Sequence, residues 1–204
     1  IGRSTIAVNL AIALQQRTKT DTILAEAHHG LSHLSLMLNM HPRYTLANVA
    51  EEPNIDRDIM HAYLQAHNSG IRLLSAPTEL DHLVELSIET WRHTLNMLTE
   101  IAPQIVIDTA AVADELLSDV LLHADDIVVV TSADIPGLRG TLGLLATLRN
   151  EQEFQGRIHV VLNRAGVRGG LDASVIQKQL REKALLTIPE DTPLATYALN
   201  RGVK

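Results

Sequence analysis

The first residues of the chain, Gly2-Arg3-Ser4-Thr5, combine the residue types that bind a phosphate group. Glycine lets the backbone approach a phosphate closely, the cation of Arg3 attracts it, and a hydroxyl such as that of Ser4 coordinates Mg²⁺. Apolar residues at helical spacing follow, so the tetrapeptide opens a predicted helix that ends near Gln16. Taken alone, it is equally consistent with an ordinary helix start that a Ser or Thr side chain caps.

A second candidate residue, Asp108, ends an apolar run over residues 104–108 that predicts a buried strand. A carboxylate at the carboxyl end of a parallel strand lies at the sheet edge where α/β proteins bind ligands. Many strands end in Asp, but a loop, a helix and then such a strand are typical of a Walker A and Walker B pair. We therefore expect Ser4 and Asp108 to hold a Mg²⁺ ion together.

The elements that must position these residues alternate between strand and helix along the chain. Strands are expected at residues 22–27, 71–75, 104–108, 126–131, 157–163 and 184–188. A helix is expected from the start of the chain to residue 16, and helical turns are expected from the break at residues 42–44 to residue 50. Further helices are expected at residues 55–66, 79–101, 113–123, 135–150, 171–180 and 194–200. This alternation predicts an α/β fold, with a mostly parallel sheet and helices on both faces.

Composition sets limits on the function. The chain has 204 residues with 46% hydrophobic content, which favours a single domain over residues 1–204. The absence of cysteine excludes disulfides, thiolate zinc sites and iron–sulfur clusters within the chain. The net charge of -7 disfavours DNA as a partner and limits any membrane association to an indirect one. We expect the first strand and the start of the phosphate loop to precede Ile1.

Several motifs together resemble those of the MinD/ParA family of deviant Walker P-loop ATPases. Residues 2–11 resemble the end of the family's loop and first helix, KGGxGK[ST]T followed by xxxNLA. Further matches occur at residues 105–109, 124–131, 161–164, 188–191 and 200–202, so the resemblance covers nearly the whole chain. Within the family, segments 34–39, 42–47 and 162–166 look most like the CpaE/TadZ branch, which is associated with positioning and assembling Tad pili.

The resemblance implies a P-loop NTPase-like fold, with ATP and Mg²⁺ as cofactors. It implies nucleotide contacts at the loop and at two later strand ends, through Gly2, Arg3, Ser4, Thr5, Asn163, Arg164 and Pro189. Asn163 would contact the adenine, although an Asn also ends strands for purely structural reasons. A homodimer is implied, closed through residues 32–43 and the loop after Asp108. Partners would be proteins of a pilus or secretion apparatus, with a cytoplasmic location and recruitment to the pole or inner membrane face.

Several positions depart from the family pattern. The family's P-loop lysine falls at Arg3, whose planar guanidinium is bulkier than an ammonium group. The Asp-x-Asp after the second strand, whose second carboxylate helps to organise the hydrolytic water, falls at Glu26 and His28. A histidine is a poor substitute for a carboxylate. We therefore treat Glu26 and His28 as degenerate catalytic positions and expect ATP hydrolysis to be weak or absent.

Alternative functions stay open on the sequence. The chain is either an ATP-binding switch or scaffold, or a nucleotide-free pseudo-ATPase that acts through protein contacts alone. A metabolic ligase or an electron-donating reductase is disfavoured, because the reductase needs cysteines and no substrate motif supports the ligase. A metal site at His28, His29 and His33 is also disfavoured, because Gly30 interrupts the cluster and no nearby Cys or Asp completes it.

Overall fold

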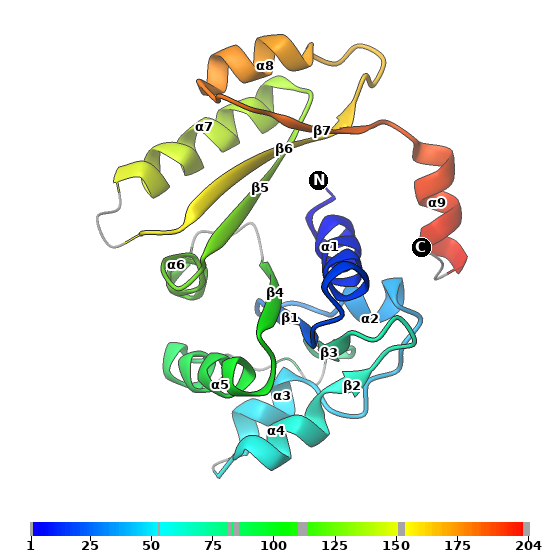
Figure 1. Ribbon diagram of the computed structural model, residues 1–204, viewed down its shortest axis with the longest axis vertical. Coiled ribbons are helices and arrows are strands. Elements are labelled where there is room, and N and C mark those ends of the chain that lie inside the picture. The colour runs from blue at the N-terminus through cyan, green and yellow to red at the C-terminus, as the bar shows by residue number, and fades with distance from the viewer. Residues whose placement is uncertain are drawn as a thin grey trace. The chain divides into compact units, whose positions relative to one another are not determined.

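A computed structural model of the chain describes residues 2–52, 54–80, 83, 86–109, 114–150 and 154–201, without the side chain of Leu199. The chain divides into two compact units (Figure 1). The N-terminal unit comprises Arg3–Asp119 and Tyr197–Lys204, and the C-terminal unit comprises Ile1–Gly2 and Val120–Thr196. That the chain forms a single domain stays a prediction.

The N-terminal unit contains a four-stranded sheet in the order β2-β3-β1-β4. The strands are β1 (Thr22–Ala27), β2 (Gln65–Ala66), β3 (Arg72–Leu74) and β4 (Gln104–Thr109). β1 pairs in parallel with both β3 and β4, whereas β2 runs antiparallel to β3. Of the helix expected over residues 55–66, residues 57–63 are helical. β2 replaces its end, because the chain turns into a hairpin in which the Gly70 N–H donates to the His67 carbonyl at 2.9 Å.

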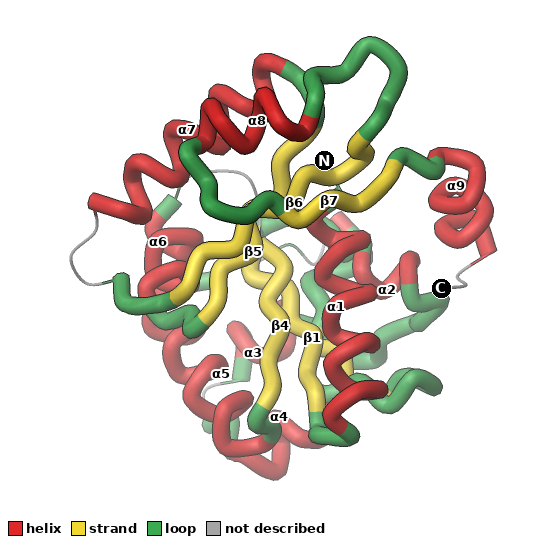
Figure 2. The backbone as a smooth tube through the Cα atoms, turned by 45° about the horizontal axis from the view of Figure 1, so that its top comes forward, coloured by secondary structure: helices red, strands yellow, loops and turns green. Residues whose placement is uncertain are grey.

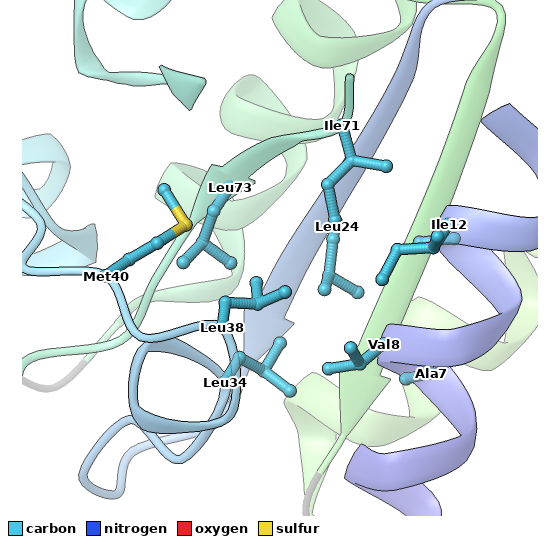
Figure 3. Close-up of a cluster of buried hydrophobic side chains, with 10 residues drawn as sticks. Ala7, Val8, Ile12, Leu24, Leu34, Leu38, Met40, Ile71 and Leu73 are labelled. Carbon is cyan, nitrogen blue, oxygen red and sulfur yellow. The ribbon is translucent and has the colours of Figure 1, made fainter. Parts of the chain in front are cut away.

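Helices cover both faces of this sheet (Figure 1). They are α1 (Arg3–Thr18), α2 (Leu34–Met37), α3 (Leu46–Glu51), α4 (Arg57–Tyr63), α5 (Ile88–Ile101) and the first part of α6 (Glu115–Leu122). Val8 and Ile12 of α1 pack against Leu24 of β1, in a cluster that Figure 3 shows. Every residue of β1 is buried, as expected for a strand covered on both faces.

Helix α5 is shorter than the sequence predicts, because it begins at Ile88 rather than at residue 79. Ser87 has an extended backbone, and its hydroxyl accepts the Thr90 N–H at 3.0 Å, which caps the first turn. The helix buries Trp91 completely. Part of the expected extension, residues 81–82 and 84–85, lies outside the described residues, as do residues 110–113 of the loop after Asp108.

The C-terminal unit contains a three-stranded parallel sheet in the order β5-β6-β7 (Figure 2). Its strands are β5 (Asp126–Ser132), β6 (Arg157–Ala165) and β7 (Leu186–Pro189). Helices α7 (Ile135–Asn150) and α8 (Ala173–Leu180) pack against β5 and β6 through a shared core that includes Val129, Leu145, Leu162 and Ile176. Helix α9 (Thr192–Arg201) begins in this unit.

The expected fold class is confirmed, since four of the five strand pairings are parallel and helices flank the sheets. Helix α7 and strand β1 have the bounds predicted from the sequence, and apart from α5 the other long elements shift by a few residues at their ends. No helix in the described part of the chain has the length and hydropathy required to span a membrane.

Candidate functional site

The Walker-type candidate residues meet at one edge of the N-terminal unit's sheet. Glu26 near the end of β1 is the register partner of Asp108 near the end of β4, so parallel pairing brings the two carboxylates side by side. Ser4 lies in the first turn of α1, and its side chain faces the Asp108 carboxyl closely enough to lower the pKa of that group. The structure thus brings together the pair predicted to hold Mg²⁺.

Asp108 is a buried carboxylate, with 5% of its surface exposed. Burial raises its pKa, the Ser4 hydrogen bond opposes that shift, and the negative charge of Glu26 adds to it. The positive charge of Arg3 acts in the opposite direction. A carboxylate and a hydroxyl oxygen are ligands that Mg²⁺ accepts, and the unpaired backbone N–H groups at the start of α1 favour an anion beside them. The donor set therefore fits a metal-bound phosphate.

Glu26 is fully buried, and its carboxylate is held by backbone donors. It accepts from the N–H groups of His33 at 3.2 Å, Leu34 at 3.4 Å and Ala76 at 2.8 Å. Burial acts to raise the pKa of Glu26, but hydrogen bonds from His28, Ser32 and Ala76 bring it below its usual value. The carboxylate therefore ties the start of α2 and the segment after β3 to the end of β1.

His28 lies beside this carboxylate, with Nε2 3.4 Å from the Glu26 Oε1 atom. The hydrogen bond to Glu26 raises the pKa of His28. Its Nδ1 atom accepts the Gly30 N–H at 3.1 Å, an arrangement that suits a neutral ring with its hydrogen on Nε2. The ring of His28 is thus engaged at Nε2 by Glu26 of β1 and at Nδ1 by Gly30 of the loop that follows.

The neighbouring histidines make other contacts. The Nδ1 atom of His29 accepts the Leu86 N–H at 3.3 Å, and His33 precedes α2 without capping it through its side chain. Among the described residues, no group of three or more His, Cys, Asp or Glu side chains is placed to hold a metal ion.

In the C-terminal unit, Asn163 and Arg164 lie near the carboxyl end of β6, and Pro189 ends the neighbouring β7. Gly2 belongs to this unit and lies against Asn163. The backbone of Gly2 has a φ of +85°, and a Cβ at this position would lie 2.2 Å from the Asn163 Nδ2 atom. Only glycine fits this approach, because any side chain would meet the amide and adopt a strained backbone.

Arg164 is engaged within its own unit. Its Nε atom donates to Glu190 Oε2, and its Nη2 atom lies 3.2 Å from both Glu190 Oε1 and the Thr192 hydroxyl. Hydrogen bonds from Arg164 and then Thr192 lower the pKa of Glu190 to about 2. Ion pairing with Glu190 does not exclude the predicted role of Arg164 in nucleotide binding, which stays a prediction.

The sequence-predicted residues thus fall into two groups. The N-terminal unit holds Arg3, Ser4, Thr5, Glu26, His28 and Asp108, and the C-terminal unit holds Gly2, Asn163, Arg164 and Pro189. Sequence reasoning missed the backbone donors to Glu26, because backbone N–H groups leave no mark in a sequence. It also missed the side chain of Ser32, which lowers the pKa of Glu26. It also missed Glu190 and Thr192, although residues 188–191 formed one of the matching motifs.

Comparisons with known proteins give one curated relative and several solved structures. No protein-family model matches the chain. The antiactivator FleN of Pseudomonas aeruginosa is 25% identical over 168 residues, which cover 81% of this chain and 58% of FleN. The chain therefore spans little more than half the length of that relative.

Two solved structures superimpose over almost the whole chain. A ParA family ATPase from Chlorobium tepidum has a TM-score of 0.88 at 23% identity, covering 98% of this chain and 84% of that one. The septum site-determining protein MinD of Pyrococcus horikoshii, complexed with Mg-ADP, has a TM-score of 0.82 at 19% identity, covering 99% of this chain and 81% of that one. The chain therefore has the α/β fold of the ParA and MinD P-loop ATPases.

Proposed function

We propose that this chain is a MinD/ParA-like switch or scaffold that binds ATP and Mg²⁺ and hydrolyses ATP weakly or not at all. The observation that carries the proposal is that Ser4, in the first turn of a 16-residue helix, lies close enough to the buried Asp108 near the end of β4 to lower the pKa of that carboxyl. A hydroxyl and a carboxylate meeting at a helix N-terminus suit a metal-bound phosphate.

The names of similar proteins support an output of position or regulation. FleN is named an antiactivator, and the Pyrococcus protein is named for determining the septum site and was solved with Mg-ADP. Together with the resemblance of segments 34–39, 42–47 and 162–166 to the CpaE/TadZ branch, they lead us to propose a role in placing or assembling a pilus or secretion system. The protein would act in the cytoplasm and be recruited to the pole or inner membrane face by partner proteins.

Weak hydrolysis is proposed from the contacts of Glu26 and His28. Phosphoryl transfer to water needs a group that orients the attacking water. The Glu26 carboxylate already accepts three backbone N–H groups, and His28 is engaged on both ring nitrogens. Bound Mg²⁺ would neutralise phosphate charge beside Ser4 and Asp108. The residues that would hold the nucleotide are therefore better preserved than those that would cleave it.

Calorimetric titration of the full-length natural protein tests the nucleotide site. We expect Asp108→Ala to weaken Mg-ATP binding more than it weakens metal-free ATP binding, since Asp108 acts on the metal. Asp58→Ala is the matched control, because Asp58 is an exposed carboxylate of α4 in the same unit. An equal loss for both forms of ATP, or no loss, would contradict the assignment of Asp108.

Single-turnover ATP cleavage tests the hydrolytic part of the proposal. Loss of one electrostatic contributor commonly costs about 10²–10³ in rate, so two altered positions leave little turnover. We expect slow cleavage by the parent, and we would compare it with His28→Asp alone and with His28→Asp combined with Arg3→Lys. Brisk cleavage by the parent that neither change affects would refute the claim of a degenerate site.

The contacts of Glu26 also favour the second candidate function, a nucleotide-free pseudo-ATPase scaffold. The same carboxylate that binds three backbone donors stabilises the edge of the sheet without any ligand. The two functions differ in the calorimetric result for the parent. No heat of binding with ATP, with or without Mg²⁺, would leave the scaffold as the function.

A further inference from the structure

Strand β7 forms one edge of the three-stranded sheet in the C-terminal unit (Figure 2). Within the described part of the chain, β7 pairs with β6 alone. All four residues of β7 are exposed, although its register partners Val161 and Leu162 on β6 are buried. An open strand edge carries a row of unpaired N–H and C=O groups, which can pair with another chain.

Two of the exposed residues of β7 are large and apolar. Leu186 is 57% exposed and Ile188 is 39% exposed. These residues are two positions apart in one strand, so their side chains lie on the same face of the sheet. A single exposed apolar residue is ordinary on a protein surface, but two that share one face of an open edge strand favour burial against a partner.

The backbone groups of β7 alternate in direction, and one hydrogen bond shows which of them face outward. The N–H of Glu190, the residue after β7, donates to the Ala165 carbonyl of β6 at 3.0 Å. The register shift between the two strands adds its extra residue to β6, so β7 itself stays regular. Ile188 and Leu186 therefore also direct their backbone groups towards β6. Thr187 directs its N–H and C=O towards the open edge.

The charges beside β7 change sign from one end of the strand to the other. Lys183 precedes β7 and Asp191 follows it, at equal distances along the chain from Thr187. Within the described residues, neither side chain takes part in an ion pair. The nearby carboxylates of Glu182 and Glu190 are already paired with arginines of the same unit. A cation is therefore left at one end of β7 and an anion at the other.

We propose that β7 pairs in antiparallel orientation with β7 of a second copy of this chain, about a two-fold axis at Thr187. In this register the two Thr187 residues exchange both of their outward backbone hydrogen bonds. Leu186 of each copy lies opposite Ile188 of the other, in the closer, non-hydrogen-bonded kind of pair. Lys183 of each copy lies at the end where Asp191 of the other copy lies. One register thus satisfies the backbone groups, the apolar side chains and the charges together.

Lysine and proline beside an edge strand are also devices that protect a sheet from pairing. Pro189 ends β7 and has no N–H, so it removes one donor from the open edge. That donor lies outside the Thr187 pair, and the two bonds at the axis remain. Lys183 opposes pairing where another cation faces it, as in a parallel arrangement of two copies. The antiparallel register brings it an anion instead.

This inference goes beyond the proposed function and does not rest on it, because pairing through β7 needs no nucleotide. A strand of four residues buries less surface than stable protein interfaces do, which is about 1,200 Å² or more. We therefore expect a weak dimer that forms reversibly as the protein concentration rises.

Sedimentation velocity of the full-length natural protein, over a concentration series without nucleotide, measures this association. We expect the parent to dimerise and Thr187→Pro to weaken the dimer by about 5-fold or more, because two backbone hydrogen bonds at the axis are lost. Pairing of β7 with β6 should survive this change, since the N–H of Thr187 points away from β6. Thr187→Ala is the matched control, because it keeps that N–H and should associate almost as the parent does.

Charge reversal tests the register. Lys183→Glu and Asp191→Lys should each weaken self-association by about 3-fold or more, because each places like charges together at both ends of the dimer. An equimolar mixture of the two variants should regain the association, since each supplies the charge that the other lacks. Asp191 also accepts the Leu194 N–H at 3.0 Å, and mixing would not rescue a variant that had merely lost this cap. Lys178→Glu, the same change at an exposed position of α8, should have no effect.

The outcomes separate this inference from the proposed function. A parent that stays monomeric over the whole series overturns the inference, as expected if Lys183 and Pro189 protect the edge or another segment of the full-length protein covers it. A dimer that Thr187→Pro leaves intact, or that mixing the charge variants does not restore, overturns it as well. So does a nucleotide-free dimer that Leu36→Asp abolishes, because Leu36 belongs to residues 32–43, the dimer surface that the resemblance implies. A parent that dimerises as expected but binds no ATP refutes the proposed function and supports this inference.

Discussion

The fully buried carboxylate of Glu26 gives the sharpest prediction about stability. Glu26→Gln keeps the size of the side chain but replaces one acceptor oxygen with an NH₂ donor. In the native carboxylate, Oε2 accepts from Ala76 at 2.8 Å, and Oε1 accepts from His33 and Leu34. Whichever way the new amide turns, its NH₂ group faces at least one buried N–H donor.

The magnitude follows from these contacts. If the amide oxygen stays on the N–H groups of His33 and Leu34, the Ala76 N–H is left unpaired. If the amide turns the other way, the N–H groups of His33 and Leu34 are left unpaired. Loss of a hydrogen bond to a charged group costs about 1.5–3 kcal/mol, and an unsatisfied buried N–H costs about 1–3 kcal/mol. These figures overlap because they describe the same event, so we expect a loss of about 3 kcal/mol. For a chain of this length, that loss lowers Tm by about 6–12 °C.

Urea unfolding followed by tryptophan fluorescence measures this loss. Trp91 is the only tryptophan, is fully buried and belongs to the same unit as Glu26, so its emission reports on that unit. Glu100→Gln is the matched control, because it makes the same chemical change at an exposed position of α5, where about ±0.5 kcal/mol is usual. If Glu26→Gln unfolded within 1 kcal/mol of the control, on the order of the method's error, the carboxylate would not be an anchor.

Three further predictions concern other parts of the chain. Arg157 and His159 lower the pKa of Asp126 to about 2. The Asp126 carboxylate therefore stabilises the fold at pH values above its usual pKa of 3.8, and this contribution is lost as the pH falls towards about 2. Circular dichroism should show that acid lowers the urea midpoint of Asp126→Asn less than that of the parent. Gly2→Ala should displace Asn163 and weaken nucleotide binding in calorimetry, whereas Gly140→Ala, with open space around its Cβ, should not. Leu36 is 72% exposed within residues 32–43, the dimer surface that the resemblance implies. Leu36→Asp should therefore abolish ATP-dependent dimerisation in light scattering, whereas the control Leu142→Asp on α7 should not. A parent that stays monomeric with ATP would refute the dimer.

The fold could be predicted from the sequence wherever the spacing of apolar residues determines whether a segment forms a helix or a strand. The runs that became β4, β5 and β6 are nearly continuous and are bounded by polar residues, and helix α7 follows one period from Ile135 to Asn150. The predicted bounds were wrong where local hydrogen bonds end or start an element at a residue that the spacing of apolar residues does not indicate. The hairpin at His67 and Gly70 ends a segment that reads as helical, and the Ser87 cap starts α5 nine residues later than the pattern suggests.

The candidate site was predictable in its composition but not in its contacts. Ser4, Glu26 and Asp108 could be placed at one sheet edge, because parallel strands present their carboxyl ends together. The saturation of Glu26 by backbone N–H groups could not be foreseen, since those donors come from segments whose paths depend on tertiary packing.

The two adjacent carboxylates at this edge divide the work of the proposed site between them. Glu26 is held by N–H groups that cannot leave without unfolding the loop, whereas the Asp108 carboxylate faces the side chain of Ser4, which can turn towards a cation. His28 supplies no negative charge to replace the missing carboxylate, because an imidazole is neutral or cationic. Its Nε2 atom faces Glu26, and its Nδ1 atom accepts the Gly30 N–H. Metal binding and water activation are therefore separable here. A carboxylate introduced at position 28 would restore water activation without disturbing metal binding. His28→Asp should therefore raise turnover while leaving Mg-ATP affinity close to that of the parent.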